Sequence, residues 1–536
     1  MASRLTKEQR LKRFLEGGFF PRELPPPFHT QDFAKYRAYL MSAWPSLDLE
    51  KFKSTSESYT IPRHLRSRRK LSIINPINQY KISKLISDNW NEIRKFLQNS
   101  QITEFQPIFD PIGDRTFFDI DFDKIEVRTA EILSICQSAV KTDISRYYPT
   151  IYTHSVAWAL YTKSYCKNHM FTASFKSSLG NKIDTYIRQC QDNQSIGIPI
   201  GPETSRVIGE IIGNALEQQI LNSIPDLEKR SLRYVDDIVV GYNSDEGPDS
   251  VISKIQRAFA HFELEMNIEK TKIYGLGERL EPEWIIPLKR NYQKGVFITI
   301  QELEEYFKTA NFLAQENSKD SVTKYAMKRS RSFRFDKDSW KYYQYWIIRL
   351  ARKNADCMPL LAQILIEKRF EGYIIDENII SKFINENIHS NAELYHTFEV
   401  SWLLFMSKGL SINIESDIED KIISMNNSIC ALLLFDLNSR GLLKKAISPA
   451  KWASAYDPTG LKDERWLFVY EATIKGWMSH TPCFIAADPF FGPMKAKKIS
   501  FYDQTANVPK TRKELTRAKQ QKSRIKFIFA HMQEYF

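Results

Sequence analysis

Residues 231–244 read SLRYVDDIVVGYNS, and apolar or β-prone residues flank Asp236 and Asp237 on both sides. This pattern predicts two short strands joined by an acidic turn. Two adjacent carboxylates at a hairpin tip repel each other, and a divalent cation would offset that repulsion. Taken alone, the stretch also fits an ordinary polar hairpin turn.

A third aspartate lies 93 residues before Asp236. Asp143 follows the run AVKT at 139–142, which ends a mostly apolar stretch. Nucleotidyl transfer with two metal ions needs carboxylates from two strands that converge on ions about 3.5–4 Å apart. An aspartate at the end of one strand, beside a hairpin that carries two more, would supply that arrangement.

Four segments stand in the order of motifs A, B, C and D of reverse transcriptases, and the chain resembles that family over roughly residues 60–300. The segments are DISRYYPTIY (143–152), GIPIGPETS (197–205), YVDD (234–237) and NIEKTKI (267–273). The resemblance implies that Asp143 and Asp236 are the main ligands of two Mg²⁺ ions, with Mn²⁺ as an alternative. It implies that Asp237 is the third catalytic carboxylate and that Ile144 belongs to the same metal and nucleotide site.

The same resemblance assigns residues to substrate binding. Tyr148 stands where the family places an aromatic ring that leaves no space for a ribose 2′-hydroxyl, which implies the use of dNTPs. Gly197, Pro199 and Gly201 belong to motif B, whose Gly-Pro turn allows the backbone to approach the bases closely. The sequence departs from the family at Ile200, where a Gln usually follows the proline.

Several basic residues are candidates for phosphate contacts. Lys270 resembles the motif D lysine that protonates departing pyrophosphate, with Lys272 as the alternative, and Arg146 in motif A is expected to contact phosphate. Five cations precede the apolar stretch 71–75, in the place of the fingers motifs, and we assign Arg69 to the substrate site. The five are Arg63, Arg66, Arg68, Arg69 and Lys70, and a solvated basic loop is the alternative.

The composition fits a large folded protein with a polyanionic partner. With 536 residues, 43% of them hydrophobic, we expect two or three structural units. The net charge of +12 favours nucleic acid as a partner, although a basic solvated surface would give the same value. The six cysteines lie far apart without a CxxC pair, which argues against a zinc site and predicts a cytoplasmic protein. The N-terminus is charged, so we expect no signal peptide there. The chain has no long apolar run, so we expect no membrane span.

The pattern along the chain predicts an α+β fold in three regions. An N-terminal extension occupies residues 1–60, and reverse-transcriptase fingers and palm occupy residues 61–300, where strand-like and helix-like segments interleave. Residues 301–536 show successive amphipathic helices and end in a basic tail. We expect these helices to form an α-solenoid or an irregular bundle.

Four features narrow the resemblance to the bacterial abortive-infection (Abi) and unknown-group defence-associated reverse transcriptases. They are FFPRELPPPF (19–28), LSIINPINQ (71–79), DISRYYPTIYTH (143–154) and the long helical C-terminal region. In that group the helical region is similar to HEAT-like repeats and several members form oligomers. The resemblance implies antiphage defence, a homo-oligomer, an RNA partner such as a non-coding RNA, and a DNA product. Some relatives extend DNA without a conventional template or prime from a protein tyrosine, and among the 25 tyrosines the sequence singles out no priming residue.

The leading hypothesis is therefore RNA-directed or untemplated DNA synthesis, in which a 3′-hydroxyl or a protein hydroxyl attacks the α-phosphate of a dNTP. An RNA polymerase or terminal transferase with the same palm is the nearest alternative. A non-catalytic RNA-binding scaffold is an alternative from another class, against which the intact trio of aspartates argues. A nuclease or phosphatase lacks supporting histidines, and we interpret His154, which follows motif A, as a packing residue.

Overall fold

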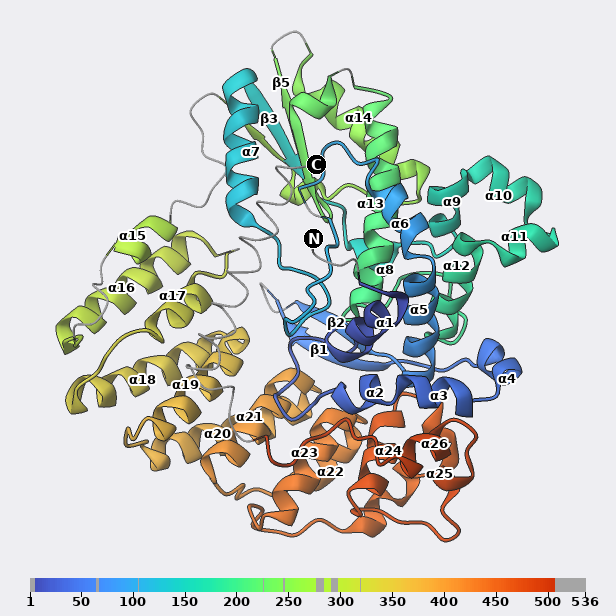
Figure 1. The fold of residues 1–536 in the computed structure, drawn as a ribbon. Coiled ribbons are helices and arrows are strands. Elements are labelled where there is room, and N and C mark those ends of the chain that lie inside the picture. Colours follow the sequence, from blue (N-terminus) through green and yellow to red (C-terminus); the bar gives the residue numbers. More distant parts are fainter. Residues whose placement is uncertain are drawn as a thin grey trace.

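A computed structural model describes residues 5–63, 67–104, 106–224, 226–243, 246–275, 284–290, 297–318 and 320–506. Helices and strands mix up to residue 275, and the described residues from 297 onward form helices and no strand. In Figure 1 the sheet lies at the top and the C-terminal helices curve along the left side and the bottom. Arg66 and the basic C-terminal tail lie outside the described residues.

A four-stranded antiparallel sheet, with strand order β4-β5-β3-β6, forms the centre of the first part. Its strands are β3 (Ser138–Thr142), β4 (Ser231–Tyr234), β5 (Asp237–Tyr242) and β6 (Lys272–Tyr274). Because side chains alternate along a strand, each strand supplies both faces of the sheet. Val239 packs with Ile132 of helix α7 (Phe122–Ile135), whereas Ile238 and Val240 join the core on the other face.

Two helices cover that second face of the sheet, opposite α7 (Figure 1). They are α13 (Glu203–Leu221) and α14 (Pro248–His261), at the two places where helical periodicity predicts helices. Apolar residues recur at helical spacing over residues 80–98, which predicts one helix, but the helix is divided at Asn89 into α5 (Pro76–Asp88) and α6 (Trp90–Leu97). Pro76 is the first residue of α5, a position that does not need its missing N–H, and Asn75 caps the helix.

A separate hairpin precedes these helices. Strands β1 (Glu57–Pro62) and β2 (Arg68–Ile73) pair antiparallel, with Tyr59 opposite Leu71. The chain before the hairpin forms four short helices, α1 (Lys7–Glu16), α2 (Gln31–Lys35), α3 (Arg37–Ala43) and α4 (Ser46–Lys51). The short helix α8 (Tyr147–Thr150) lies near the centre of Figure 1. Helices α9 (Ser155–Tyr161), α10 (Lys163–His169), α11 (Ala173–Ser177) and α12 (Leu179–Gln189) form a small lobe at the right of Figure 1.

The C-terminal half consists of successive helices with short connections. They are α15 (Ile285–Arg290), α16 (Ile300–Glu316), α17 (Val322–Ser330), α18 (Lys337–Lys353), α19 (Met358–Phe370), α20 (Glu377–Glu393), α21 (Thr397–Leu410), α22 (Glu419–Ser424), α23 (Ser428–Ser439), α24 (Trp466–Ile474), α25 (Phe484–Ala487) and α26 (Phe491–Ala496). Helices α16, α18, α19 and α21–α24 coincide with amphipathic segments of the sequence, whereas α15, α17, α20, α25 and α26 do not.

Two large cores divide the molecule differently from the order of the sequence. One core runs from Leu11 to Tyr502 and joins the N-terminal helices, the β1–β2 hairpin and the C-terminal helices. Phe19 packs against Phe501 and Trp466 within it. The other core lies between the sheet and helices α5, α6, α12, α13 and α14. This first core crosses both boundaries that the sequence predicts, near residues 60 and 300. The division of the chain into three domains at these residues stays a prediction.

The remaining compositional expectations concern membranes and thiols. Within the described residues, no helix combines the length and the apolar character needed to cross a membrane. All six cysteines are free, and five of them are buried.

Candidate active site

The strand register brings the three distant aspartates to one end of the sheet. In the β3–β5 pair Thr142 lies opposite Ile238, so the next residues, Asp143 and Asp237, face each other where the pairing ends. Asp236 occupies the two-residue turn between β4 and β5, because Tyr234 pairs with Asp237. The antiparallel order thus gathers carboxylates that are 93 residues apart in the sequence.

The three carboxylates interact electrostatically. Burial raises the pKa of Asp236, and the charge of Asp143 raises it further. Burial also raises the pKa of Asp237 to about 6, with a further contribution from Asp236, while Lys141 opposes the shift. Neighbouring carboxylates that raise the pKa of Asp236 and Asp237 form a place where a cation is favourable.

Lys270 meets Asp143 at this end of the sheet. The Lys270 ammonium donates to Asp143 Oδ2, while Asp143 Oδ1 is buried without a hydrogen-bond partner. The main-chain N–H of Asn267 donates to the Asp143 carbonyl at 2.9 Å, which fixes the short 3₁₀ turn Ile268–Lys270 beside β3. Lys272, the alternative lysine, is exposed on β6 opposite Lys141. Of the two lysines, Lys270 is therefore the one in contact with the acidic group.

Tyr148 lies beside the turn aspartate. Burial raises the pKa of Tyr148, and the charges of Glu210 and Asp236 raise it further, so the ring remains a neutral phenol. Its ring packs on Gly209 of α13, where an added Cβ would lie 3.2 Å from the Tyr148 hydroxyl oxygen. The preceding Tyr147 is buried and donates to the Gly209 carbonyl at 2.6 Å. The glycine thus allows the ring to lie against the helix.

The segment from Gly197 to Gly201 connects this region to the β1–β2 hairpin. Gly197, with φ of 82°, donates to the Ile151 carbonyl at 2.8 Å, and Ile198 donates to the Tyr148 carbonyl at 2.9 Å. The Ile200 carbonyl accepts from the N–H of Ser72 on β2 at 2.8 Å. The segment therefore bridges the chain around Tyr148 and strand β2.

Close packing holds the end of this segment. Pro199 is buried, and Ile200, where the resembled family has Gln, packs against the large core that contains the C-terminal helices. Gly201 has φ of 132°, and an added Cβ there would lie 2.7 Å from Pro21 Cγ. Only a glycine fits at this position, because both the backbone conformation and the space exclude a side chain.

Residues 63–320 match the family model described as reverse transcriptase (RNA-dependent DNA polymerase). The chain contains a reverse transcriptase domain. The match covers slightly less than half of the chain and includes Asp143, Lys270 and the hairpin with Asp236 and Asp237. By this domain the chain is an enzyme of the RNA-directed DNA polymerase class, whose members use divalent metal ions.

Comparison with curated proteins finds no match. Among solved structures, telomerase from Candida albicans, in complex with the TWJ fragment of telomeric RNA, is similar to the chain at 12% identity and a TM-score of 0.27. The alignment covers 69% of this chain and 67% of that chain. The assignment rests on the family match, not on this structural likeness.

The three aspartates of the reverse transcriptase domain offer the kind of donor atoms that a divalent ion binds. Carboxylate oxygens are the ligands that Mg²⁺ and Mn²⁺ prefer, and Asp143 Oδ1 is an unused buried acceptor. In the described part of the chain, no group of three or more His, Cys, Asp or Glu side chains is already arranged as a metal site. The Lys270 ammonium supplies the positive charge at Asp143 instead. The residues are thus suitable ligands that are not preassembled.

The basic residues of the hairpin lie in different environments. Arg69 keeps contact with solvent, and its guanidinium interacts electrostatically with Asp236 and Tyr148 of the reverse transcriptase domain. Arg68 is not available to substrate, because it forms a two-pronged ion pair with Glu399 of α21 at 2.7 and 2.8 Å. Arg146 is exposed in a left-handed conformation before α8 and forms no ion pair with the residues described. Of the five cations, Arg68 is therefore engaged within the protein, whereas Arg69 stays a candidate for a substrate contact.

A buried arginine that the motifs did not indicate supports the catalytic turn. Arg233 of β4 donates through Nη1 to the Val235 carbonyl at 2.9 Å and through Nη2 to Glu210 Oε2 at 3.0 Å. Its Nε lies 3.6 Å from Glu217 Oε2. Val235 has φ of 58°, a strained conformation for a β-branched residue, so the turn needs such support.

The sequence carries a signal for this network in α13. Glu210, Gly213 and Glu217 are spaced i, i+3 and i+7, which places them on one face of the otherwise apolar helix. An added Cβ at Gly213 would lie 2.6 Å from Arg233 Nη1, so the glycine provides the space for the guanidinium. His154 is partly exposed. Its ring packs edge to face on Tyr152, as expected of a packing residue, and it also contacts the buried Asp184 at 2.8 Å.

Proposed function

We propose that the chain is a DNA polymerase of antiphage defence that transfers nucleotides from dNTPs to a 3′-hydroxyl or to a protein hydroxyl. The observation that carries the proposal is the convergence of Asp143, Asp236 and Asp237 at one end of the sheet. The reverse transcriptase match at residues 63–320 supports it. The place in bacterial defence rests on the resemblance of four sequence segments to the abortive-infection and unknown-group enzymes.

The acidic residues would organise the reaction. Asp143, Ile144, Asp236 and Asp237 would hold two Mg²⁺ or Mn²⁺ ions, which when bound lower the pKa of the attacking hydroxyl and neutralise the triphosphate. Lys270 stands beside Asp143, where its ammonium can give a proton to the departing pyrophosphate. Positioning and charge neutralisation account for most of the rate enhancement, because the protein forms no covalent bond to the nucleotide during elongation.

Substrate selection would depend on the surfaces around the carboxylates. The Tyr148 ring, held on Gly209, would exclude a 2′-hydroxyl and so select dNTPs. Arg69 would contact the triphosphate from the side of the hairpin, and Arg146 would contact phosphate from motif A. Gly197, Pro199 and Gly201 would place the backbone under the nascent base pair, and Ile200 in place of Gln is compatible with restricted templating.

The helical half would serve RNA binding and assembly. We propose that helices α16–α26 are HEAT-like repeats, that the chain forms a homo-oligomer in the cytoplasm, and that it binds RNA such as a non-coding RNA. The basic composition, with a net charge of +12, supports a nucleic-acid partner. The domain limits at 1–60, 61–300 and 301–536 are part of this proposal.

The experiment that tests the function is a product analysis. The full chain is purified with the nucleic acid that accompanies it, single labelled dNTPs are added, and the products are sequenced. A DNA product complementary to the bound RNA would indicate templated synthesis, and a homopolymer would indicate synthesis without a template. Incorporation of rNTPs in preference to dNTPs would replace the proposal by an RNA polymerase. If an Asp236→Asn, Asp237→Asn variant still protected cells against phage, the alternative of a non-catalytic RNA-binding scaffold would be favoured.

A further inference from the structure

A cavity of about 1020 Å³ separates the tip of the β1–β2 hairpin from the helical half of the chain. Arg63, Arg68 and Arg69 line it on the side of the hairpin. Lys324 of α17, Lys353 at the end of α18 and His396 before α21 line it on the side of the helices. This volume is at the upper end of the range of small-molecule sites, roughly 300–1,000 Å³.

The lining carries more positive than negative charge. Five arginine and lysine side chains face three carboxylates, those of Asp320, Asp356 and Glu399. Two of the three are engaged: Asp320 accepts from the Trp284 ring N–H at 2.8 Å, and Glu399 is paired with Arg68. Within the described residues the other four cations form no ion pair with a carboxylate. These are Arg63, Arg69, Lys324 and Lys353.

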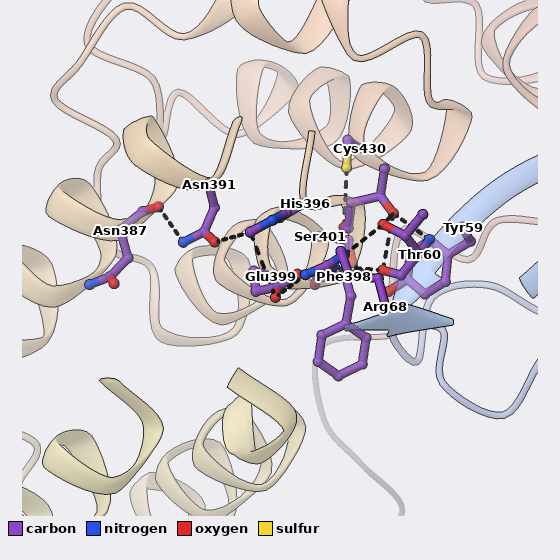
Figure 2. A network of polar contacts seen from close by, with 11 residues as sticks. Tyr59, Thr60, Arg68, Asn387, Asn391, His396, Phe398, Glu399, Ser401 and Cys430 are labelled. Atoms are coloured by element: carbon purple, nitrogen blue, oxygen red, sulfur yellow. Dashed lines mark hydrogen bonds and ion pairs between the residues drawn. The ribbon is translucent and has the colours of Figure 1, made fainter. Parts of the chain in front are cut away.

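The ion pair of Arg68 with Glu399 is a fixed part of the wall. Figure 2 shows Arg68 on the hairpin strand facing Glu399, with His396 and Asn391 farther along the same side. Arg68 also donates to the Thr60 carbonyl at 2.9 Å, and His396 Nδ1 lies 3.0 Å from Asn391 Oδ1. The hairpin and α21 are thus held together beside the four unpaired cations.

Two further features favour an anionic ligand that is recognised by its charge and not through a nucleobase. The N-terminus of α17 reaches the cavity through Ser321 and Thr323. The side chain of the N-cap residue Ser321 makes no capping hydrogen bond, so the main-chain N–H groups there add positive potential. Of the described residues that line the cavity, none is Phe, Tyr or Trp, so it lacks the large rings on which a nucleobase usually stacks. Several cations around one cavity match an oxyanion with several charges.

We propose that this cavity binds a polyphosphate, either the triphosphate part of a nucleotide or free pyrophosphate, through Arg63, Arg69, Lys324 and Lys353. Arg69 connects the cavity to the catalytic carboxylates, because it interacts electrostatically with Asp236 while lining the cavity. The polyphosphate would therefore enter or leave past the hairpin, and the helical half would take part in substrate or product handling. The assignment of the anion as substrate or product rests on the proposed polymerase function, whereas its binding does not.

The test is isothermal titration of the full chain with pyrophosphate, dTTP and thymidine, in EDTA so that metal-dependent binding is absent. A Lys324→Glu, Lys353→Glu variant is compared with Lys337→Glu, Lys341→Glu, which changes two exposed lysines of α18 outside the cavity. We expect pyrophosphate affinity to fall at least about tenfold in the first variant and to stay within about twofold in the second. A Lys324→Gln, Lys353→Gln variant, expected to weaken binding less, serves if the charge reversal impairs folding.

The arms of the experiment distinguish the sources of the polyphosphate. Binding of dTTP that falls in parallel indicates a nucleotide, and binding of pyrophosphate alone indicates the product; both support the site. Equal affinities in wild type and cavity variant, equal losses in the two variants, or thymidine binding as tight as that of dTTP would overturn it. The proposal would also be overturned if the binding of a single-stranded oligonucleotide, and not the binding of pyrophosphate, depended on Lys324 and Lys353. If an Asp236→Asn, Asp237→Asn variant still binds pyrophosphate, the proposed site is supported even when polymerase activity is absent.

Discussion

The Arg233 guanidinium donates a hydrogen bond to the Val235 carbonyl at 2.9 Å and so ties the turn that carries Asp236 to the buried interior. The same guanidinium pairs with Glu210 and lies close to Glu217, both on α13. A planar group with several donors is needed to serve these partners at once. The position of the turn therefore depends on helix α13 as well as on the strand pairing.

Replacing Arg233 by Lys should impair catalysis more than substrate binding. Lysine keeps a positive charge between Glu210 and Glu217, but a single ammonium cannot also hold the Val235 carbonyl. We expect kcat for dNTP incorporation to fall by about 10- to 100-fold with a nearly unchanged KM, because small displacements of catalytic groups are costly. Steady-state kinetics measure this, with Arg257→Lys at an exposed residue of α14 as the control. An unchanged kcat, or a proportional change in KM, would contradict the role.

Substitutions at Tyr148 should separate the ring from its hydroxyl. Tyr148→Ala removes the ring that lies on Gly209 and should raise the use of rNTPs relative to dNTPs by roughly 10- to 100-fold. Tyr148→Phe keeps the ring and should preserve the selectivity. Competition between labelled rNTP and dNTP measures the ratio. If the alanine variant discriminates as well as the wild type, the steric role is wrong.

The ion pair between Arg68 and Glu399 should stabilise the contact of the hairpin with the helical half. Glu399 is 3% exposed, so Arg68→Ala leaves a buried charge without its partner and should cost about 3 kcal/mol. A double-mutant cycle with Glu399→Gln, followed by denaturant unfolding, should give a coupling energy of about 1–3 kcal/mol. The exposed pair of Lys308 and Glu304, for comparison, should give less than about 0.5 kcal/mol. Similar coupling in the two pairs would show that the first is not a structural link.

Glu57 should make the stability of the chain depend on pH. Burial raises the pKa of Glu57 to about 8 from an ordinary 4.5, although Ser428 donates to it and opposes the shift. Between these pH values the folded chain keeps a proton that the unfolded chain releases, so stability should fall as pH rises from about 5 to about 8. The loss is at most about 1.4 kcal/mol per pH unit.

Glu57→Gln should lack this dependence, because the amide does not titrate. The measurement is the difference in thermal midpoint between wild type and variant across this pH range, with the variant gaining relative stability as pH rises. A constant difference would show that Glu57 is ionised in the folded chain.

The sequence was most informative where a local pattern determines the structure. The alternation around Asp236 and Asp237 predicts the β4–β5 hairpin, and the helical periodicity predicts α13 and α14. Asp143 could be placed near them because it follows an apolar stretch that forms β3. These features depend on residues close in the sequence, so they can be read without the structure.

The missed features depend on contacts between distant segments. No sequence pattern indicates the role of Arg233, because charged residues are normally expected at the surface, whereas here two buried glutamates compensate the charge. In the sequence Arg68 resembles its neighbouring cations, because its partner Glu399 lies 331 residues away. The division of the expected helix at Asn89 and the first core, which joins both ends of the chain, likewise arise from packing that no local pattern records.

The central claim is that Asp143, Asp236 and Asp237 act together as one metal-dependent catalytic group. The most direct measurement is incorporation of labelled dNTPs, with Mg²⁺ or Mn²⁺, by the wild type and the variants Asp143→Asn, Asp236→Asn and Asp237→Asn. Asp226→Asn, at an exposed residue paired with Lys229, is the matched control. We expect Asp143→Asn and Asp236→Asn each to lose at least about 100-fold in rate, Asp237→Asn to lose less, and the control to match the wild type. Wild-type incorporation by Asp143→Asn or Asp236→Asn would contradict the claim.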